Sequence, residues 1–169
     1  SLPQMPVKKA PIREVKIHDF PIDDMPIACG ILIVAPPGSG KSTLAENFVF
    51  YRKHLFPVAK VFIGTEDDYE KLKKIFKPLF VNYGYSSDQV EEFVKRERHQ
   101  ALTYKTKGDL RRRAVLWFDD LSDNVNIWET PAIISLVKLG SRHWDLFGIW
   151  CTQAAKDFPP AFRSSVAYV

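Results

Sequence analysis

Residues 30–43 read GILIVAPPGSGKST, and this stretch decides the fold. Its first five residues form an apolar run without polar alternation, which is typical of a β-strand buried on both faces. The following residues are rich in Gly and Pro, which predicts a tight turn. Over residues 41–53 the apolar positions recur at helical spacing, at Leu44, Ala45, Phe48 and Val49. The stretch therefore predicts a buried strand, a tight turn and a helix in direct succession.

The predicted turn has the Walker A pattern, with alanine in place of the first glycine. Glycines let the backbone wrap so that successive N–H groups point at one centre, where a phosphate fits. The helix that follows adds unpaired N–H groups and the positive end of its dipole. Lys41 is expected to reach the β- and γ-phosphates of ATP, and the Ser42 hydroxyl to hold Mg²⁺. The predicted nucleotide-binding residues are Pro37, Gly38, Ser39, Gly40, Lys41, Ser42 and Thr43.

The remainder of the chain alternates between strand and helix patterns. Strands are expected at residues 58–64, 114–118 and 147–152, and helices at residues 67–76, 87–105 and 131–142. Ser87 is the expected cap of the second of these helices. Such alternation predicts an α/β fold, a three-layer sandwich whose mostly parallel central sheet is covered by helices on both faces.

The first 26 residues differ from the rest, because they hold five of the twelve prolines. Such spacing prevents a stable helix, so residues 1–26 are expected to form an extended arm. Residues 27–169 are expected to form one nucleotide-binding domain. Residues 166–169 resemble the start of a strand, and residue 1 is not Met, so the chain is interpreted as a piece of a longer protein, truncated at its C-terminus.

Composition excludes several classes of protein. The chain has 169 residues, 46% hydrophobic and 26% charged, the balance of a globular domain rather than of a disordered chain. Its longest apolar runs fall far short of the ~20 residues of a membrane span, and no signal peptide pattern opens it. Cys29 and Cys151 lie in apolar surroundings and are expected to be reduced core thiols, with a buried disulfide as the alternative. The net charge of +4 permits a polyanionic partner without requiring one.

A second motif, residues 114–120, reads AVLWFDD, an apolar strand that ends in two carboxylates. In a parallel sheet its last residues lie beside the phosphate loop. Asp119 is therefore expected to hold Mg²⁺ through water, and Asp120 to act as the general base that polarises the attacking water. Glu66 is the rival base, although an acid in a first helical turn also serves to complement the dipole. A third candidate, Gln153, ends the last predicted strand and is expected to sense the γ-phosphate or orient the water.

Together, Lys41, the Asp119–Asp120 pair and the GIWCTQ strand at 148–153 resemble the FtsK–HerA class of hexameric DNA-pumping ATPases. Residues 140–143 and 159–164, GSRH and PPAFRS, resemble the genome-packaging ATPases of poxviruses and other large eukaryotic DNA viruses. The resemblance spans about residues 27–169 and implies a P-loop NTPase fold of the RecA/ASCE type. This chain departs from the family at Asp120, because the family commonly has glutamate at that position. The family also continues with a fifth strand where this chain stops.

This resemblance implies a Mg²⁺-dependent ATPase that moves viral double-stranded DNA into capsids as a homo-oligomer, a hexameric ring. It also implies contact with a capsid or portal-vertex protein, and a location in the host cytoplasm, the virus factory or the virion. A neighbouring subunit would supply an arginine, for which Arg142 and then Arg163 are the candidates. The alternative interpretation of Arg142 is a cation that complements the dipole at a helix C-terminus, and that of Arg163 is a surface ion pair.

Two basic clusters are candidates for DNA contact, although charge runs on helices are usually solvated faces. They are Lys71, Lys73, Lys74 and Lys77, and Lys105, Lys107, Arg111, Arg112 and Arg113. Two other enzyme classes remain open. A small-molecule or nucleoside kinase also uses a phosphate loop but needs an acceptor pocket, and a helicase or initiator ATPase would unwind a duplex rather than move it intact.

Overall fold

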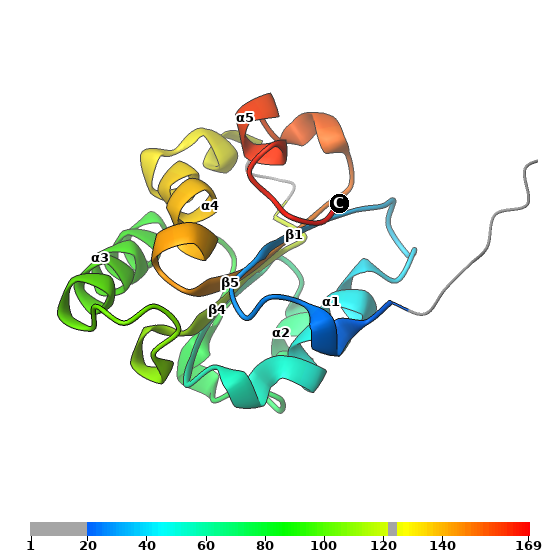
Figure 1. Ribbon diagram of the computed structural model, residues 1–169. Coiled ribbons are helices and arrows are strands. Elements are labelled where there is room, and N and C mark those ends of the chain that lie inside the picture. The colour runs from blue at the N-terminus through cyan, green and yellow to red at the C-terminus, as the bar shows by residue number, and fades with distance from the viewer. Residues whose placement is uncertain (1–19, 122–124) are drawn as a thin grey trace, which may run out of the picture.

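The computed structural model describes residues 20–121 and 125–169 (Figure 1). Its centre is a five-stranded sheet in the order β1-β5-β4-β2-β3, with every pair of neighbours parallel. The strands are β1 (Gly30–Val34), β2 (Val58–Ile63), β3 (Val81–Tyr83), β4 (Ala114–Asp119) and β5 (Leu146–Thr152). The strand that precedes the phosphate loop, β1, therefore lies beside β5, and β5 lies beside β4.

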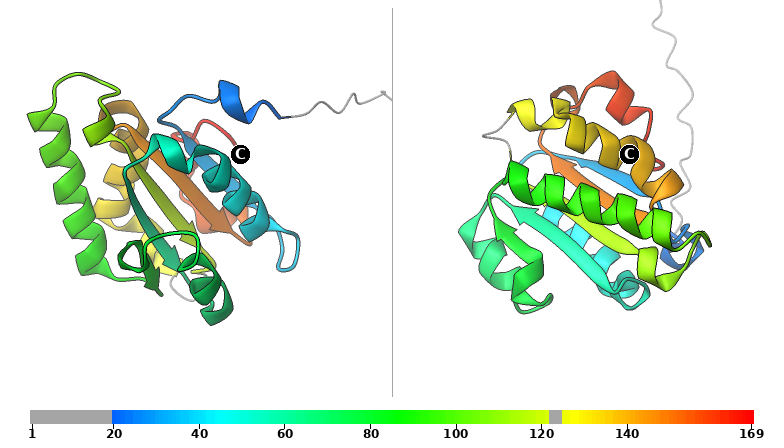
Figure 2. Two further views of the ribbon diagram at one scale, coloured as in Figure 1. Left: turned by 90° about the horizontal axis from the view of Figure 1, so that it is seen from below. Right: turned by 90° about the vertical axis from the view of Figure 1, so that its left-hand side faces the viewer.

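Helices cover both faces of this sheet (Figure 2). One face carries α1 (Lys41–Arg52) and α2 (Glu66–Leu72), and the other carries α3 (Ser87–Thr103), α4 (Pro131–His143) and α5 (Pro160–Arg163). Side chains of β4 alternate between two apolar cores: Val115 and Trp117 join the first, Leu116 and Phe118 the second. The three-layer α/β sandwich predicted from the sequence is confirmed.

Short 3₁₀ helices complete the connections. They are η1 (Ile22–Asp24), η2 (Lys53–Leu55), η3 (Pro78–Phe80), η4 (Leu110–Arg112), η5 (Val125–Glu129) and η6 (Ala155–Asp157). Within the described ranges, no helix combines the length and the apolar character that crossing a membrane requires.

The sequence missed β3, and its prediction of one helix cap was wrong. β3 has only three residues and pairs with β2 at the edge of the sheet, so it is too short to show a periodic pattern. The cap of α3 is Ser86 rather than Ser87, because the Ser86 side chain accepts a hydrogen bond from the Gln89 amide. The helix predicted at 67–76 is shorter, ending at Leu72.

The last residues of the chain run along the free edge of β1. Tyr168 forms a parallel bridge with Ile31, and the Leu32 amide donates to the Tyr168 carbonyl at 2.9 Å. This is the geometry expected of a strand beginning near residue 166. Phe20 packs edge-on against Tyr168 at 5.7 Å, which brings the start of the described chain to the same edge. Most of the predicted N-terminal arm, residues 1–19, lies outside the described residues.

Cys29 and Cys151 are buried free thiols, as predicted. In the sheet Cys151 lies opposite Ile33, four residues along β1 from Cys29. Four residues of extended strand span roughly 13 Å, far more than a disulfide allows. The alternative of a buried bridge between them is therefore excluded.

Candidate functional site

Three neighbouring strands bring the predicted motifs together at the carboxyl edge of the sheet. The phosphate loop follows β1, Gln153 follows β5, and Asp119 and Asp120 lie at the end of β4. Between them is a cavity of about 240 Å³. Its lining residues are Lys41, Asp120, Leu121, Trp128, Cys151, Thr152, Gln153, Ala154 and Asp157. Lys41 and Gln153 therefore face the same cavity from two different elements.

The phosphate loop has the backbone that its glycines permit. Gly38 and Gly40 have φ values of 73° and 88°, in the left-handed region, and a Cβ at either position would meet no atom within 4 Å. Glycine is thus favoured there by backbone conformation and not by lack of space. The Ser39 hydroxyl donates to the Pro36 carbonyl at 2.6 Å and braces the turn. The N–H groups of the first turn of α1, from Lys41 onward, have no partner within the helix, so they are available to an anion.

Asp119 is a buried carboxylate beside the start of α1. It is 2% exposed, and burial raises its pKa to about 6, while Ser42 and the charge of Lys41 oppose this shift. The Ser42 hydroxyl lies close to the Asp119 carboxylate, but the two groups do not form a hydrogen bond of ordinary geometry. Neither carboxylate oxygen of Asp119 has a hydrogen-bond partner in the described part of the chain. A buried, unpartnered carboxylate next to a hydroxyl matches the oxygen ligands that Mg²⁺ takes, so these two residues fit the predicted metal.

Asp120 and Gln153 are joined directly, because the Gln153 amide nitrogen Nε2 donates to Asp120 Oδ1 at 3.1 Å. Asp120 has a φ of 49°, a left-handed conformation that Asp tolerates better than most residues. Its position is held from β2: the Gly64 amide donates to the Asp119 carbonyl at 3.0 Å. A Cβ on Gly64 would lie 1.7 Å from the Asp120 carbonyl oxygen. The sequence predicted no role for Gly64. Its role becomes visible only from the close approach of the ends of β2 and β4.

Glu66, the rival base, is the exposed first residue of α2 and does not line the cavity. Asp68 lies closer to the metal-binding candidates, because its charge contributes to the raised pKa of Asp119. The Thr65 hydroxyl donates to Asp68 Oδ2 at 2.7 Å and fixes that carboxylate. Of these two candidate bases, Asp120 lines the cavity and Glu66 does not.

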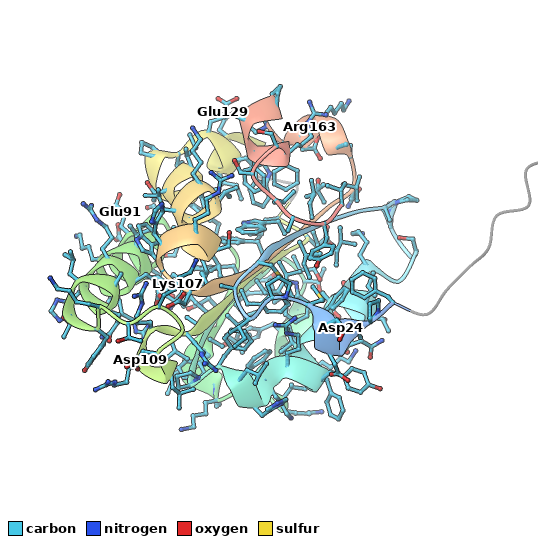
Figure 3. The ribbon with its side chains drawn as sticks, in the orientation of Figure 1. Asp24, Glu91, Lys107, Asp109, Glu129 and Arg163 are labelled. Atoms are coloured by element: carbon cyan, nitrogen blue, oxygen red, sulfur yellow. The ribbon has the colours of Figure 1, made fainter. Side chains whose placement is uncertain are left out.

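The two arginine candidates lie outside the cavity. Arg142 is exposed in the last turn of α4, and Arg163 is exposed at the end of α5 (Figure 3). Neither lines the cavity of its own chain.

Two further cavity residues carried no signal in the sequence. Asp157 Oδ2 accepts a hydrogen bond of 2.6 Å from the Thr152 hydroxyl, which ties the loop after Gln153 back to the end of β5. Trp128 is buried and packs against Phe158 with ring centroids 4.4 Å apart. Trp128 lies in η5 and Asp157 in η6, 3₁₀ helices too short to show a periodic pattern, and no motif spacing points to either residue.

No protein-family profile matches this sequence. It is 35% identical over 136 residues to Uncharacterized protein 075L of Invertebrate iridescent virus 6, an alignment that covers 80% of this chain and 51% of the relative. It is 26% identical over 163 residues to Uncharacterized protein 015R of Frog virus 3, covering 96% of this chain and 49% of that one. The chain thus spans about half the length of these viral relatives.

Among solved structures, the fold is similar to that of the genome packaging NTPase B204 from Sulfolobus turreted icosahedral virus 2 in complex with ATP-gammaS. The TM-score is 0.58 at 21% sequence identity, and the match covers 84% of this chain and 72% of B204. This likeness confirms the predicted P-loop NTPase fold.

Proposed function

We propose that this chain is the ATPase part of a motor that hydrolyses ATP and drives double-stranded DNA into a viral capsid. One observation carries the proposal: Lys41 and the Asp120–Gln153 pair line one cavity at the carboxyl edge of the sheet, and Asp119, the residue before Asp120, lies close enough to Lys41 to feel its charge. The viral relatives and the likeness to B204, a genome packaging NTPase, support the choice of DNA packaging among ATPase functions.

Lys41 and the amides of the phosphate loop would bind the β- and γ-phosphates, and the Ser42 hydroxyl and the Asp119 carboxylate would hold Mg²⁺. When bound, the metal would offset negative charge on the phosphate oxygens. Lys41 is 8% exposed and adjacent to Asp119, so its ammonium is desolvated and its attraction for phosphate is strengthened.

Asp120 and Gln153 are suited to position the attacking water. The water oxygen would attack the γ-phosphorus while a water proton passes toward Asp120, and the bond to the β–γ bridging oxygen would break. ADP would leave with that electron pair, and phosphate with the new oxygen. Gln153 can report this step, because its amide nitrogen already contacts Asp120 and would rearrange when the γ-phosphate departs.

The decisive experiment replaces Lys41 by alanine. ATP hydrolysis is expected to fall to background, because the phosphate charge loses its buried partner, while circular dichroism and the unfolding transition stay close to those of the parent. Lys74→Ala removes an exposed lysine two residues beyond the end of α2 and serves as the control with normal turnover. Undiminished hydrolysis in Lys41→Ala would refute the enzyme assignment.

A nucleoside or small-molecule kinase is the main rival. The direct Asp120–Gln153 hydrogen bond favours water over a bulky acceptor, because both polar groups point at the same small space. ATP turnover measured with and without duplex DNA separates the two: stimulation by DNA supports the motor, and strict dependence on a nucleoside supports the kinase. A strand-separation assay then distinguishes a helicase from a motor that moves the duplex intact.

The finer points belong to the same proposal. We infer a hexameric ring in which Arg142, or else Arg163, completes the neighbouring site, and kinship with the packaging ATPases of poxviruses and other large eukaryotic DNA viruses. A capsid or portal-vertex protein would anchor the ring in the virus factory or the virion. Mass measurement in solution with ATP and duplex DNA tests the ring directly.

A further inference from the structure

Positive charge is concentrated in one part of the chain. Residues 95–113 contain eight Lys and Arg side chains and two acidic ones, a net of +6, whereas the whole chain carries +4. They form the second half of α3, the loop that follows it and η4, elements that lie side by side in the fold (Figures 1 and 2). We call the exposed cations of this region, Lys95, Arg98, Lys105, Lys107 and Arg111, the basic face.

Some of the charge in this region is structural. Arg112 is 5% exposed: its Nε lies 2.9 Å from Asp145 Oδ2, and its terminal nitrogens donate to the Tyr104 and His143 carbonyls at 3.0 and 2.6 Å. Arg96 pairs with the buried Glu97. Arg112 thus ties η4 to the loop after α3 and to the end of α4, and the charge of Arg96 is neutralised by Glu97.

The same contacts make the face a fixed scaffold. The Gly108 amide donates to Asp145 Oδ2 at 2.9 Å, and Arg113 Nε donates to the Gly108 carbonyl at 2.9 Å. The loop that carries Lys105 and Lys107 is thus pinned at both sides. Figure 3 shows Lys107 and Asp109 on the side of the molecule away from Glu129 and Arg163.

Most cations of the basic face lack a counter-ion. Arg111 pairs with Asp109 at 2.6 Å and lies over the Tyr104 ring at 4.0 Å. Lys95, Arg98, Lys105 and Lys107 form no ion pair with any described residue. An unpaired cluster on a braced backbone attracts a polyanion, because binding displaces no internal ion pair and needs no rearrangement of the support.

The other basic cluster is neutralised within the fold. Residues 66–77 carry four acidic and four basic side chains, so their net charge is zero. Lys71 pairs with Glu46 at 2.5 Å and Lys73 with Glu70 at 2.8 Å. Of the two clusters that the sequence offered, only the one on α3 and η4 leaves an excess of charge.

We propose that the basic face binds the phosphate backbone of duplex DNA, an inference that rests on the proposed function. Tyr104 is the only Phe, Tyr or Trp of residues 95–113, and the Arg111 guanidinium covers it. The face therefore offers no open aromatic platform on which unpaired bases could stack, which favours a duplex over a single strand.

The basic face lies at the amino edge of the sheet, opposite the cavity. η4 leads directly into the start of β4, and the six residues of β4 separate it from Asp119 by roughly 20 Å. DNA bound there would leave the nucleotide cavity open, so the two ligands can bind one subunit together.

The test is a charge reversal at two exposed, unpaired positions, Lys105→Glu with Lys107→Glu. The matched control is Lys74→Glu with Lys77→Glu, which reverses two exposed lysines of the neutral cluster. Binding of a fluorescent mixed-sequence duplex is followed by anisotropy from about 50 to about 200 mM salt. The slope of log affinity against log salt should fall by roughly two, about 0.9 for each lost phosphate contact, with at least a ~10-fold loss of affinity.

Unchanged binding in the Lys105/Lys107 variant, an equal loss in the control, or no duplex binding by the parent chain would each overturn the inference. Tighter binding to an anionic lipid vesicle than to the duplex would overturn it as well. Basal ATP turnover is read separately and is expected to stay normal in this variant. If the basic face binds DNA but the parent chain hydrolyses no ATP, the proposed function is refuted and this inference stands. If ATP turnover is normal but the basic face binds no DNA, this inference is refuted and the ATPase assignment stands.

Discussion

At the scale of single residues, the candidate site depends on a close approach between two strands. Gly64 at the end of β2 and Asp120 at the end of β4 touch through their backbones, and Asp120 takes a left-handed conformation there. This conformation lets the Asp120 side chain accept its hydrogen bond from Gln153. The geometry of the reacting groups therefore relies on a glycine that has no chemical role of its own.

Gly64→Ala is predicted to damage the site more than the fold. The new Cβ would lie 1.7 Å from the Asp120 carbonyl oxygen, so the β4 terminus must shift and carry Asp120 away from Gln153. ATP turnover should fall by about 10- to 100-fold, since displacements near 1 Å cost that order of rate. Gly84→Ala is the control for backbone strain: Gly84 has a φ of 72°, so alanine there costs stability, but its Cβ would meet nothing within 4 Å and would not displace Asp120, and turnover of the folded variant should stay normal. Equal turnover in the two variants would refute this account of Gly64.

At the scale of elements, α3 packs against the rest of the fold with an ionisable side chain, Glu97, in its buried face. Glu97 is fully buried, and burial raises its pKa to about 7 although Arg96 opposes the shift; Asp145 adds to it. The folded state therefore keeps this proton to a higher pH than the unfolded chain, whose carboxyl group titrates near 4.5. The neutral Glu97 side chain therefore contributes its full stability below about pH 4.5, where both states are protonated. This contribution to the free energy of unfolding is lost as the pH rises through about 7.

Glu97→Gln is predicted to stabilise the protein above neutral pH. Glutamine keeps the shape of the neutral acid, so at alkaline pH the variant avoids the cost of a buried charge and should gain about 1–3 kcal/mol in the free energy of unfolding. At about pH 4.5 the two proteins should differ little. Urea unfolding at both pH values measures this, with Glu91→Gln, an exposed change in the same helix, as the control. A variant that is less stable at high pH would show that the Arg96 pair outweighs burial.

At the scale of the whole molecule, the two edges of the sheet separate two kinds of chemistry. The carboxyl edge holds the cavity, and the amino edge holds the basic face together with Arg142 in the last turn of α4. Arg142 directly precedes His143, whose carbonyl accepts from Arg112. Arg142 therefore lies next to the basic face, and a contribution to that face competes with its proposed role in a neighbour's nucleotide site.

Arg142→Ala separates these two roles. As an arginine acting on a neighbour, its loss should abolish ATP turnover, and mixing this variant with Lys41→Ala subunits should restore part of it, because a mixed interface combines an intact loop with an intact arginine. As part of the basic face, its loss should weaken duplex binding and leave basal turnover normal. A fully active variant with unchanged duplex affinity would remove Arg142 from both.

The sequence alone determined the fold class and the polar groups of the candidate site, for a local reason. A buried parallel strand needs an unbroken apolar run, and a phosphate loop needs glycines at set spacings. Both patterns are formed by residues adjacent in sequence, so residues 30–43 and 114–120 predict their own local structure. The order of motifs along the chain then predicted that Lys41, Asp119, Asp120 and Gln153 lie at one edge. Their assigned catalytic roles stay predictions.

Only the tertiary structure decided what depends on residues distant in sequence. Gly64 against Asp120, Thr152 with Asp157, and Glu66 lying outside the cavity all follow from how strands and loops approach one another. The same holds for part of the charge: the sequence shows that acidic residues accompany only one of the two basic clusters, but the pairing of Lys71 with the distant Glu46 appears only in the tertiary structure. Contacts between distant residues leave no local pattern, because their partners are chosen by packing rather than by spacing along the chain.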